Sequence, residues 1–133
     1  MKNKPVLGVE DTRRIAAAAE AEALAHGWAV TIAIADDGGH LLWLQRLDGA
    51  APISAQIAAA KARTSALGRR ETKVYEDMIN QGRTAFLSAP ALEGMLEGGL
   101  PVLVDGQCVG AVGVSGVKSG EDAQIARAGI AAL

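Results

Sequence analysis

The sequence predicts an α+β fold in which helices pack on an antiparallel sheet made of two hairpins. Two pairs of apolar stretches are each joined by a short turn that contains glycine, at residues 36–39 and 105–106. Such turns are typical of β-hairpins. Alanine-rich stretches lie before, between and after the two pairs. Helices between two hairpins favour an antiparallel sheet over a doubly wound parallel sheet.

Length and composition indicate one globular domain that spans residues 1–133. A chain of 133 residues fits a single core. Half of its residues are hydrophobic and 21% are charged, which excludes a disordered chain. Only one Phe, one Tyr and two Trp are present. The core must therefore consist of Ala, Val, Leu and Ile, in elements that pack closely.

Charge and cysteine content limit the classes of partner. A net charge of −2 gives no support for nucleic-acid binding, which needs a basic face. The single Cys108 rules out an internal disulfide. No apolar run approaches the ~20 residues that span a bilayer, and the first ten residues lack the apolar region of a signal peptide. We expect a cytoplasmic protein without nucleic-acid or membrane partners.

The first predicted helix follows an extended lead-in at residues 1–9. Asp11 or Thr12 is expected to cap this helix, because both side chains accept backbone N–H groups. The helix should end near His26. Gly27 follows at the position where a left-handed residue commonly ends a helix.

The first hairpin should pair residues 30–35 with residues 40–47. The first of these strands is apolar without interruption, which indicates burial on both faces. Ser54 is then expected to cap a second helix, which runs from residue 55 to about 67 and stops at Gly68.

The second half of the chain should contain a short helix capped by Thr72, an irregular segment at 84–90 and a loop at 93–99. The second hairpin pairs residues 100–104 with 107–115 through Asp105-Gly106, a strong two-residue turn signal. A last helix is expected from residue 119 to the end of the chain.

The two histidines are candidate functional residues. A protonated imidazole at His26, in the last turn of the first helix, would complement the helix dipole. A neutral imidazole there would instead be a good ligand for iron or cobalt. His40 lies beside the first glycine turn, either as a turn residue or as a substrate-binding residue. The residues alone leave these alternatives open.

Cations around the middle helices are candidates for binding an anionic group. Lys61 and Thr64 are one helical turn apart and would hold a carboxylate or propionate at the rim of an apolar pocket. Arg46 and Arg63 are further candidates for substrate binding. Such charges otherwise form a solvated face.

Gly110 and Gly113 lie inside a predicted strand, which indicates close approach by a backbone, a ligand or another subunit. We expect a cleft between the end of the first helix, the face of the second helix and residues 109–115, where these glycines leave room for a flat ligand. Alternatively, the glycines only admit a neighbouring helix.

Five segments carry a resemblance to a known family. They read AIADDGGHLL, QRLDGA, AAKARTSAL, GGLPVLVDG and VGAVGVSG, at residues 33–42, 45–50, 59–67, 98–106 and 109–116. In this order they resemble the GlcG/HbpS-like family, also called the haem-degrading domain, which includes the C-terminal domain of PduO-type proteins.

The resemblance implies a profilin-like sandwich, homo-oligomers from dimers to octamers, and a small-molecule ligand. It implies haem as a cofactor, or less commonly a cobalamin-type corrinoid or iron. In haem-binding relatives an axial histidine lies near the end of the first helix, and His26 matches this place as the metal ligand. Lys61, Arg63 and Thr64 match the family's helix motif.

Three functions follow as hypotheses. The first is a protein that binds haem or a related tetrapyrrole. The second is a small catabolic enzyme of lyase, isomerase or hydrolase type. It would act on a carboxylate metabolite at a subunit interface, with His40 or a desolvated Lys61 as general base. The third is a structural oligomerisation domain.

Overall fold

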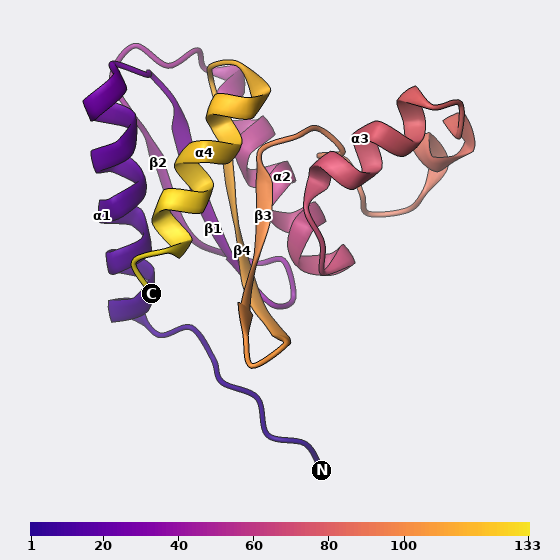
Figure 1. Ribbon diagram of the computed structural model, residues 1–133, viewed down its shortest axis with the longest axis horizontal. Helices are drawn as coiled ribbons and strands as arrows, with labels where there is room; N and C mark the ends of the chain where they lie inside the picture. The colour runs from indigo at the N-terminus through magenta and orange to yellow at the C-terminus, as the bar shows by residue number, and fades with distance from the viewer.

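A four-stranded antiparallel sheet forms the centre of the computed structural model, which describes residues 1–133 (Figure 1). Its strand order is β2-β1-β4-β3, so the two hairpins meet through β1 and β4. The strands are β1 (Thr31–Asp36), β2 (Leu41–Arg46), β3 (Gly99–Val104) and β4 (Gln107–Ser115). The predicted sheet of two hairpins is confirmed.

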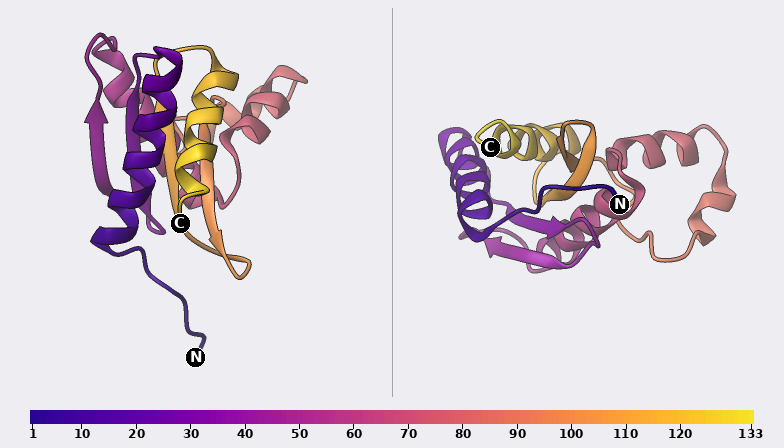
Figure 2. Two further views of the ribbon diagram at one scale, coloured as in Figure 1. Left: turned by 60° about the vertical axis from the view of Figure 1, so that its left-hand side comes forward. Right: turned by 90° about the horizontal axis from the view of Figure 1, so that it is seen from below.

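Helices cover both faces of the sheet. The elements are α1 (Val9–His26), α2 (Ile53–Gly68), α3 (Thr72–Asn80), α4 (Ser119–Ile130) and the short 3₁₀ helix η1 (Thr84–Ser88). Helices α1 and α4 lie side by side on one face and α2 covers the other, while α3 and η1 extend beyond the sheet (Figure 2). The α+β class is therefore confirmed. None of these helices has the length and apolar composition that crossing a bilayer needs.

Strand β1 is buried on both faces, as its apolar sequence predicts. Ile32 and Ile34 pack toward α1 and α4 in a cluster of large aliphatic side chains. Ala33 and Ala35 pack against α2 through Ala58 and Ala62. Because the apolar side chains of this second interface are alanines and Gly113 faces the same helix, α2 lies close to the sheet.

Neighbouring elements occupy the space beside Gly110 and Gly113, where we expected room for a ligand. A Cβ atom at Gly113 would lie 2.2 Å from the carbonyl oxygen of Ala58 in α2. A Cβ atom at Gly110 would lie 2.4 Å from the carbonyl oxygen of Ala35 and 2.7 Å from Cδ1 of Leu7. The glycines thus admit protein, which corrects the expectation of space for a ligand.

Two predicted helix starts are wrong by a few residues. Helix α1 begins at Val9, because the Asp11 carboxylate reaches back to accept the N–H of Gly8 at 2.8 Å. Helix α2 begins at Ile53. Ser54 is therefore inside it, where its hydroxyl donates to the carbonyl of Ala51 at 2.6 Å.

Both hairpin turns form where they were predicted. Asp105 and Gly106 have φ angles of 51° and 76° and separate β3 from β4 as a two-residue turn. In the first turn, the Asp36 carboxylate accepts the N–H groups of Gly38 and His40, each at 2.9 Å.

Candidate functional site

Helix α1 ends in a geometry that brings two aromatic rings together. Gly27 has a φ of 67°, and its N–H donates to the carbonyl of Leu24. The N–H of Trp28 donates to the carbonyl of Ala23 at 2.9 Å. This is the Schellman arrangement of a helix end. The His26 and Trp28 rings on either side of Gly27 stack, with centroids 4.3 Å apart and planes 15° apart.

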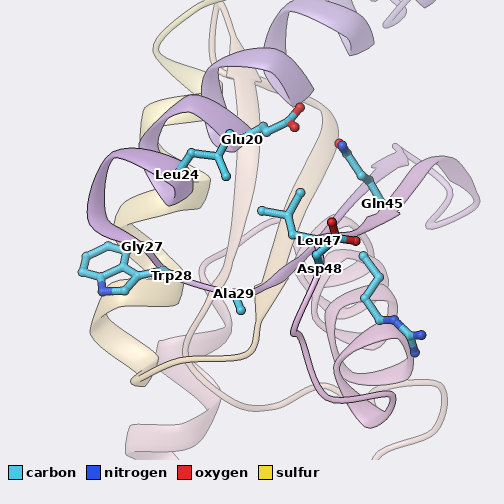
Figure 3. Close-up of a pocket in the computed structure, with 9 residues that line it drawn as sticks. Glu20, Leu24, Gly27, Trp28, Ala29, Gln45, Leu47 and Asp48 are labelled. Atoms are coloured by element: carbon cyan, nitrogen blue, oxygen red, sulfur yellow. The ribbon is translucent and has the colours of Figure 1, made fainter.

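A hollow of about 410 Å³ lies between the end of α1 and the end of β2 (Figure 3). Its apolar lining includes Leu24, Trp28 and Leu47, and its charged lining consists of Glu20, Arg46 and Asp48. The volume falls in the range of roughly 300–1,000 Å³ that small-molecule sites occupy. His26 does not itself line the hollow but stacks on Trp28, which does.

The His26 imidazole is accessible and has a carboxylate beside it. Its side chain is 43% exposed, and its Nε2 lies 3.4 Å from Oε1 of Glu22. The same nitrogen lies 3.4 Å from the side-chain amide of Gln124 in α4. Both contacts use Nε2, so Nδ1 has no protein partner. Histidines that bind metals commonly donate their second N–H to a carboxylate, and Glu22 is placed for this role.

Lys61 points into the protein and bridges three elements. Its Nζ donates to the carbonyl of Val114 at 2.9 Å and to Oδ2 of Asp122 at 3.2 Å. Both side chains of this ion pair are 4% exposed. Burial raises the pKa of Asp122, against the opposing effects of Lys61 and of the Val117 N–H. Asp122 is not among the candidates that the sequence indicates, because its only signal is its place in the first turn of a helix.

The Thr64 side chain also bonds to another part of the protein. It is fully buried, and its hydroxyl oxygen accepts the N–H of Gly94 at 3.0 Å. The loop before β3 is thereby fixed to α2. Thr64 and Lys61 therefore contact the protein's own backbone, and their predicted contact with a ligand stays a prediction.

The remaining candidates lie at opposite ends of β2. His40 is in the β1–β2 turn, 78% exposed, with Nδ1 3.5 Å from Oδ1 of Asp36. Arg63 is exposed on α2 and packs beside Gly39 of the same turn. Arg46 lines the hollow at the other end of β2.

The cleft that was expected between the first helix, the second helix and β4 does not form within one chain. The sheet separates α1 from α2, α2 fills the space beside Gly113, and Ala35 and Leu7 fill the space beside Gly110. No cluster of three or more His, Cys, Asp or Glu side chains could hold a metal ion. A metal at His26 would therefore need most of its ligands from a cofactor.

Comparison with known proteins tests the resemblance in the sequence. The model of the family described as "Haem degrading protein HbpS-like" matches residues 7–131. The chain belongs to the HbpS-like family. This HbpS-like chain is 60% identical to Protein GlcG of Escherichia coli (strain K12) over 115 residues, which are 86% of this chain and 85% of GlcG.

Two solved structures show the same HbpS-like fold. A PduOC:heme complex has a TM-score of 0.90 and 25% identity, covering 97% of this chain and 96% of that one. A double mutant of HbpS from Streptomyces reticuli has a TM-score of 0.89 and 33% identity, covering 100% of this chain and 90% of that one. The resemblance to the GlcG/HbpS-like family is confirmed.

Proposed function

We propose that this chain binds haem beside the C-terminal end of α1, with His26 as the protein ligand of the iron. The observation that carries the proposal is the accessible His26 imidazole, stacked on a tryptophan that lines the hollow. Membership of the HbpS-like family and similarity to a protein solved as a haem complex support haem as the ligand class.

The side chains at this end of α1 fit haem by chemical type. Leu24, Trp28 and Leu47 offer apolar surface to a porphyrin, and the Arg46 guanidinium suits a propionate. His26 would hold the iron through its unpartnered nitrogen, with the Glu22 carboxylate 3.4 Å from the other nitrogen to accept its N–H. When bound, haem would supply an iron that an imidazole can ligate.

The proposal concerns haem and not a corrinoid, which the relatives compared above do not support. The homo-oligomer and the cytoplasmic location expected from the sequence stay predictions. The alternative of a small enzyme for a carboxylate metabolite also stays a prediction. Its proposed residues do not converge: His40 lies in a turn, Arg46 lines the α1 hollow, and Lys61 is buried against Asp122.

Haemin titration followed by Soret absorption tests the proposal. The parent protein should give a saturable spectral change. His26→Ala should weaken binding by at least about tenfold, which corresponds to ~1.4 kcal/mol. His40→Ala is the matched control, because it removes the other imidazole from an exposed turn.

Two results would overturn the proposal. A His26→Ala protein with the parent's spectrum and affinity would remove His26 as the ligand. A parent protein without a saturable change would remove haem binding altogether.

A further inference from the structure

A second hollow, of about 520 Å³, lies at the end of the sheet where α1 begins. Its lining comes from the N-terminal segment, from the β3–β4 turn with the start of β4, and from the residue that follows α2. Figure 1 shows the course of these backbone segments. It is thus separate from the hollow where α1 ends. The residues that line it are Lys2, Lys4, Arg69, Gly106, Gln107 and Cys108.

The charge of this hollow is one-sided. Its lining contains three cations and no carboxylate, in a chain whose net charge is −2. Lys4 pairs with Asp37 at 2.5 Å, whereas Lys2 and Arg69 take part in none of the ion pairs of the structure. Lys2 and Arg69 therefore line the hollow without an ion pair of their own, and a nearby carboxylate, Asp37, is paired with Lys4.

A neighbouring carboxylate responds to these cations. The pKa of Asp37 lies below its ordinary value, chiefly because Lys4 donates a hydrogen bond to it, and the charge of Arg69 acts in the same direction. Anionic groups are therefore stabilised at the edge of this hollow.

Two features position the segments that carry these cations. The side-chain amide of Gln107 donates to the carbonyl of Asn3 at 3.2 Å, which ties the lysine-bearing segment to β4. Arg69 ends α2 in the left-handed conformation, with a φ of 56°. Glycine is the usual residue at such a position, and another residue costs conformational energy.

The glycine that precedes Arg69 has another structural role. A Cβ atom at Gly68 would lie 1.9 Å from the hydroxyl of Tyr75, so packing against α3 requires glycine there. No such contact accounts for arginine at the next position. Arg69 therefore lines the hollow together with the two lysines from a backbone position that disfavours arginine.

We propose that this hollow binds a compact anion with at least two negative charges, such as a phosphate group or a polycarboxylate. Arg69 is the expected forked donor to two oxygens of the anion, a geometry that suits both chemistries. Lys2 and Lys4 add charge from the N-terminal segment. This anion site is independent of haem binding.

Calorimetric titration at low ionic strength tests the proposal, with inorganic phosphate in one arm and citrate in the other. The parent should bind at least one of them, and the stronger arm identifies the chemistry. Arg69→Gly removes the guanidinium and relieves the left-handed strain, so the variant should melt no lower than the parent. Its anion affinity should fall by at least about tenfold.

Two further variants make the result decisive. Arg13→Ala removes one exposed arginine from α1, away from the hollow, and should keep the affinity within about twofold of the parent. Lys2→Gln changes an exposed side chain of the N-terminal segment, so it should weaken binding without affecting folding.

Any of three results would contradict the anion site. The first is a parent protein that binds neither anion at millimolar concentration. The second is retention of the parent's anion affinity by both Arg69→Gly and Lys2→Gln. The third is a loss of anion affinity in Arg13→Ala as large as the loss in Arg69→Gly, which would indicate a general effect of charge.

Discussion

Among single residues, Lys61 has the largest predicted effect on stability. It is the ion-pair partner of Asp122 in a buried region, so Lys61→Met leaves an uncompensated carboxylate. We expect the free energy of unfolding at neutral pH to fall by ~3–5 kcal/mol. The double variant Lys61→Met with Asp122→Asn should lose less of the free energy of unfolding, because neither side chain of the buried pair then carries a charge. Urea denaturation of the three proteins measures both effects.

The pH dependence of the stability of Lys61→Met provides a second test. Burial raises the pKa of Asp122 in the folded protein above its ordinary 3.8. Between these two pKa values the folded state binds more protons than the unfolded state, so this group's contribution to stability falls as pH rises. Lys61→Met removes the positive charge that lowers the pKa of Asp122. The pH range between the folded and unfolded pKa values should therefore widen. The variant should therefore recover stability on acidification, and a loss that is the same at every pH would contradict the account.

The surroundings of His26 and Lys61 were predictable to different degrees, for a physical reason. The place of His26 at a helix end is a local property that the sequence predicts, while its role as a metal ligand stays a prediction. The partner of Lys61 is 61 positions away in sequence, so no local pattern predicts whether the lysine meets a ligand or Asp122. The stack of His26 on Trp28 likewise depends on how the chain turns at Gly27.

At the scale of elements, the contact between α2 and β4 depends on the absence of a side chain at Gly113. Gly113→Ala places a Cβ atom 2.2 Å from a carbonyl oxygen of α2, so the helix must move. We expect a loss of ~1–3 kcal/mol in the free energy of unfolding. Thermal or urea denaturation measures it.

Gly120 provides the matched control for that substitution. It lies in α4, and a Cβ atom there would meet nothing within 4 Å. Gly120→Ala should leave stability unchanged or raise it by up to about 1 kcal/mol. If Gly113→Ala unfolds at the same denaturant concentration as Gly120→Ala, the close packing of α2 on β4 is not what positions this helix.

The elements themselves were predictable because their signals are local. Alternating turn and apolar stretches identify both hairpins, and two positive φ angles at Asp105-Gly106 match a two-residue turn. Helix starts were less predictable, since several polar residues near a start can bond the free N–H groups. Both Asp11 and Ser54 lie within two residues of the first helical residue, so sequence alone places the boundary only approximately.

At the scale of the whole molecule, the free edge of the sheet at β2 is apolar. Leu41, Leu42 and Leu44 of this strand are 48%, 41% and 48% exposed. Exposed apolar edge strands are normally covered by another chain. We therefore expect a homo-oligomer that buries β2, and light scattering should give a multiple of the chain mass.

Substitution on that edge tests which surface assembles. Leu42→Lys with Leu44→Lys should reduce the oligomer mass, because a charge is costly to bury. Leu103→Lys is the control, since Leu103 is 56% exposed on β3, the other edge strand. A parent protein with the monomer mass at micromolar concentration would contradict the expectation.

The position of iron in a crystal of the haemin-treated protein is the sharpest test of haem binding at His26. Anomalous scattering at the iron edge locates the metal without assumptions about the porphyrin. We expect a single strong peak within bonding distance of an imidazole nitrogen of His26, beside the hollow lined by Trp28 and Arg46. A peak beside His40, or anywhere away from the end of α1, would contradict this expectation.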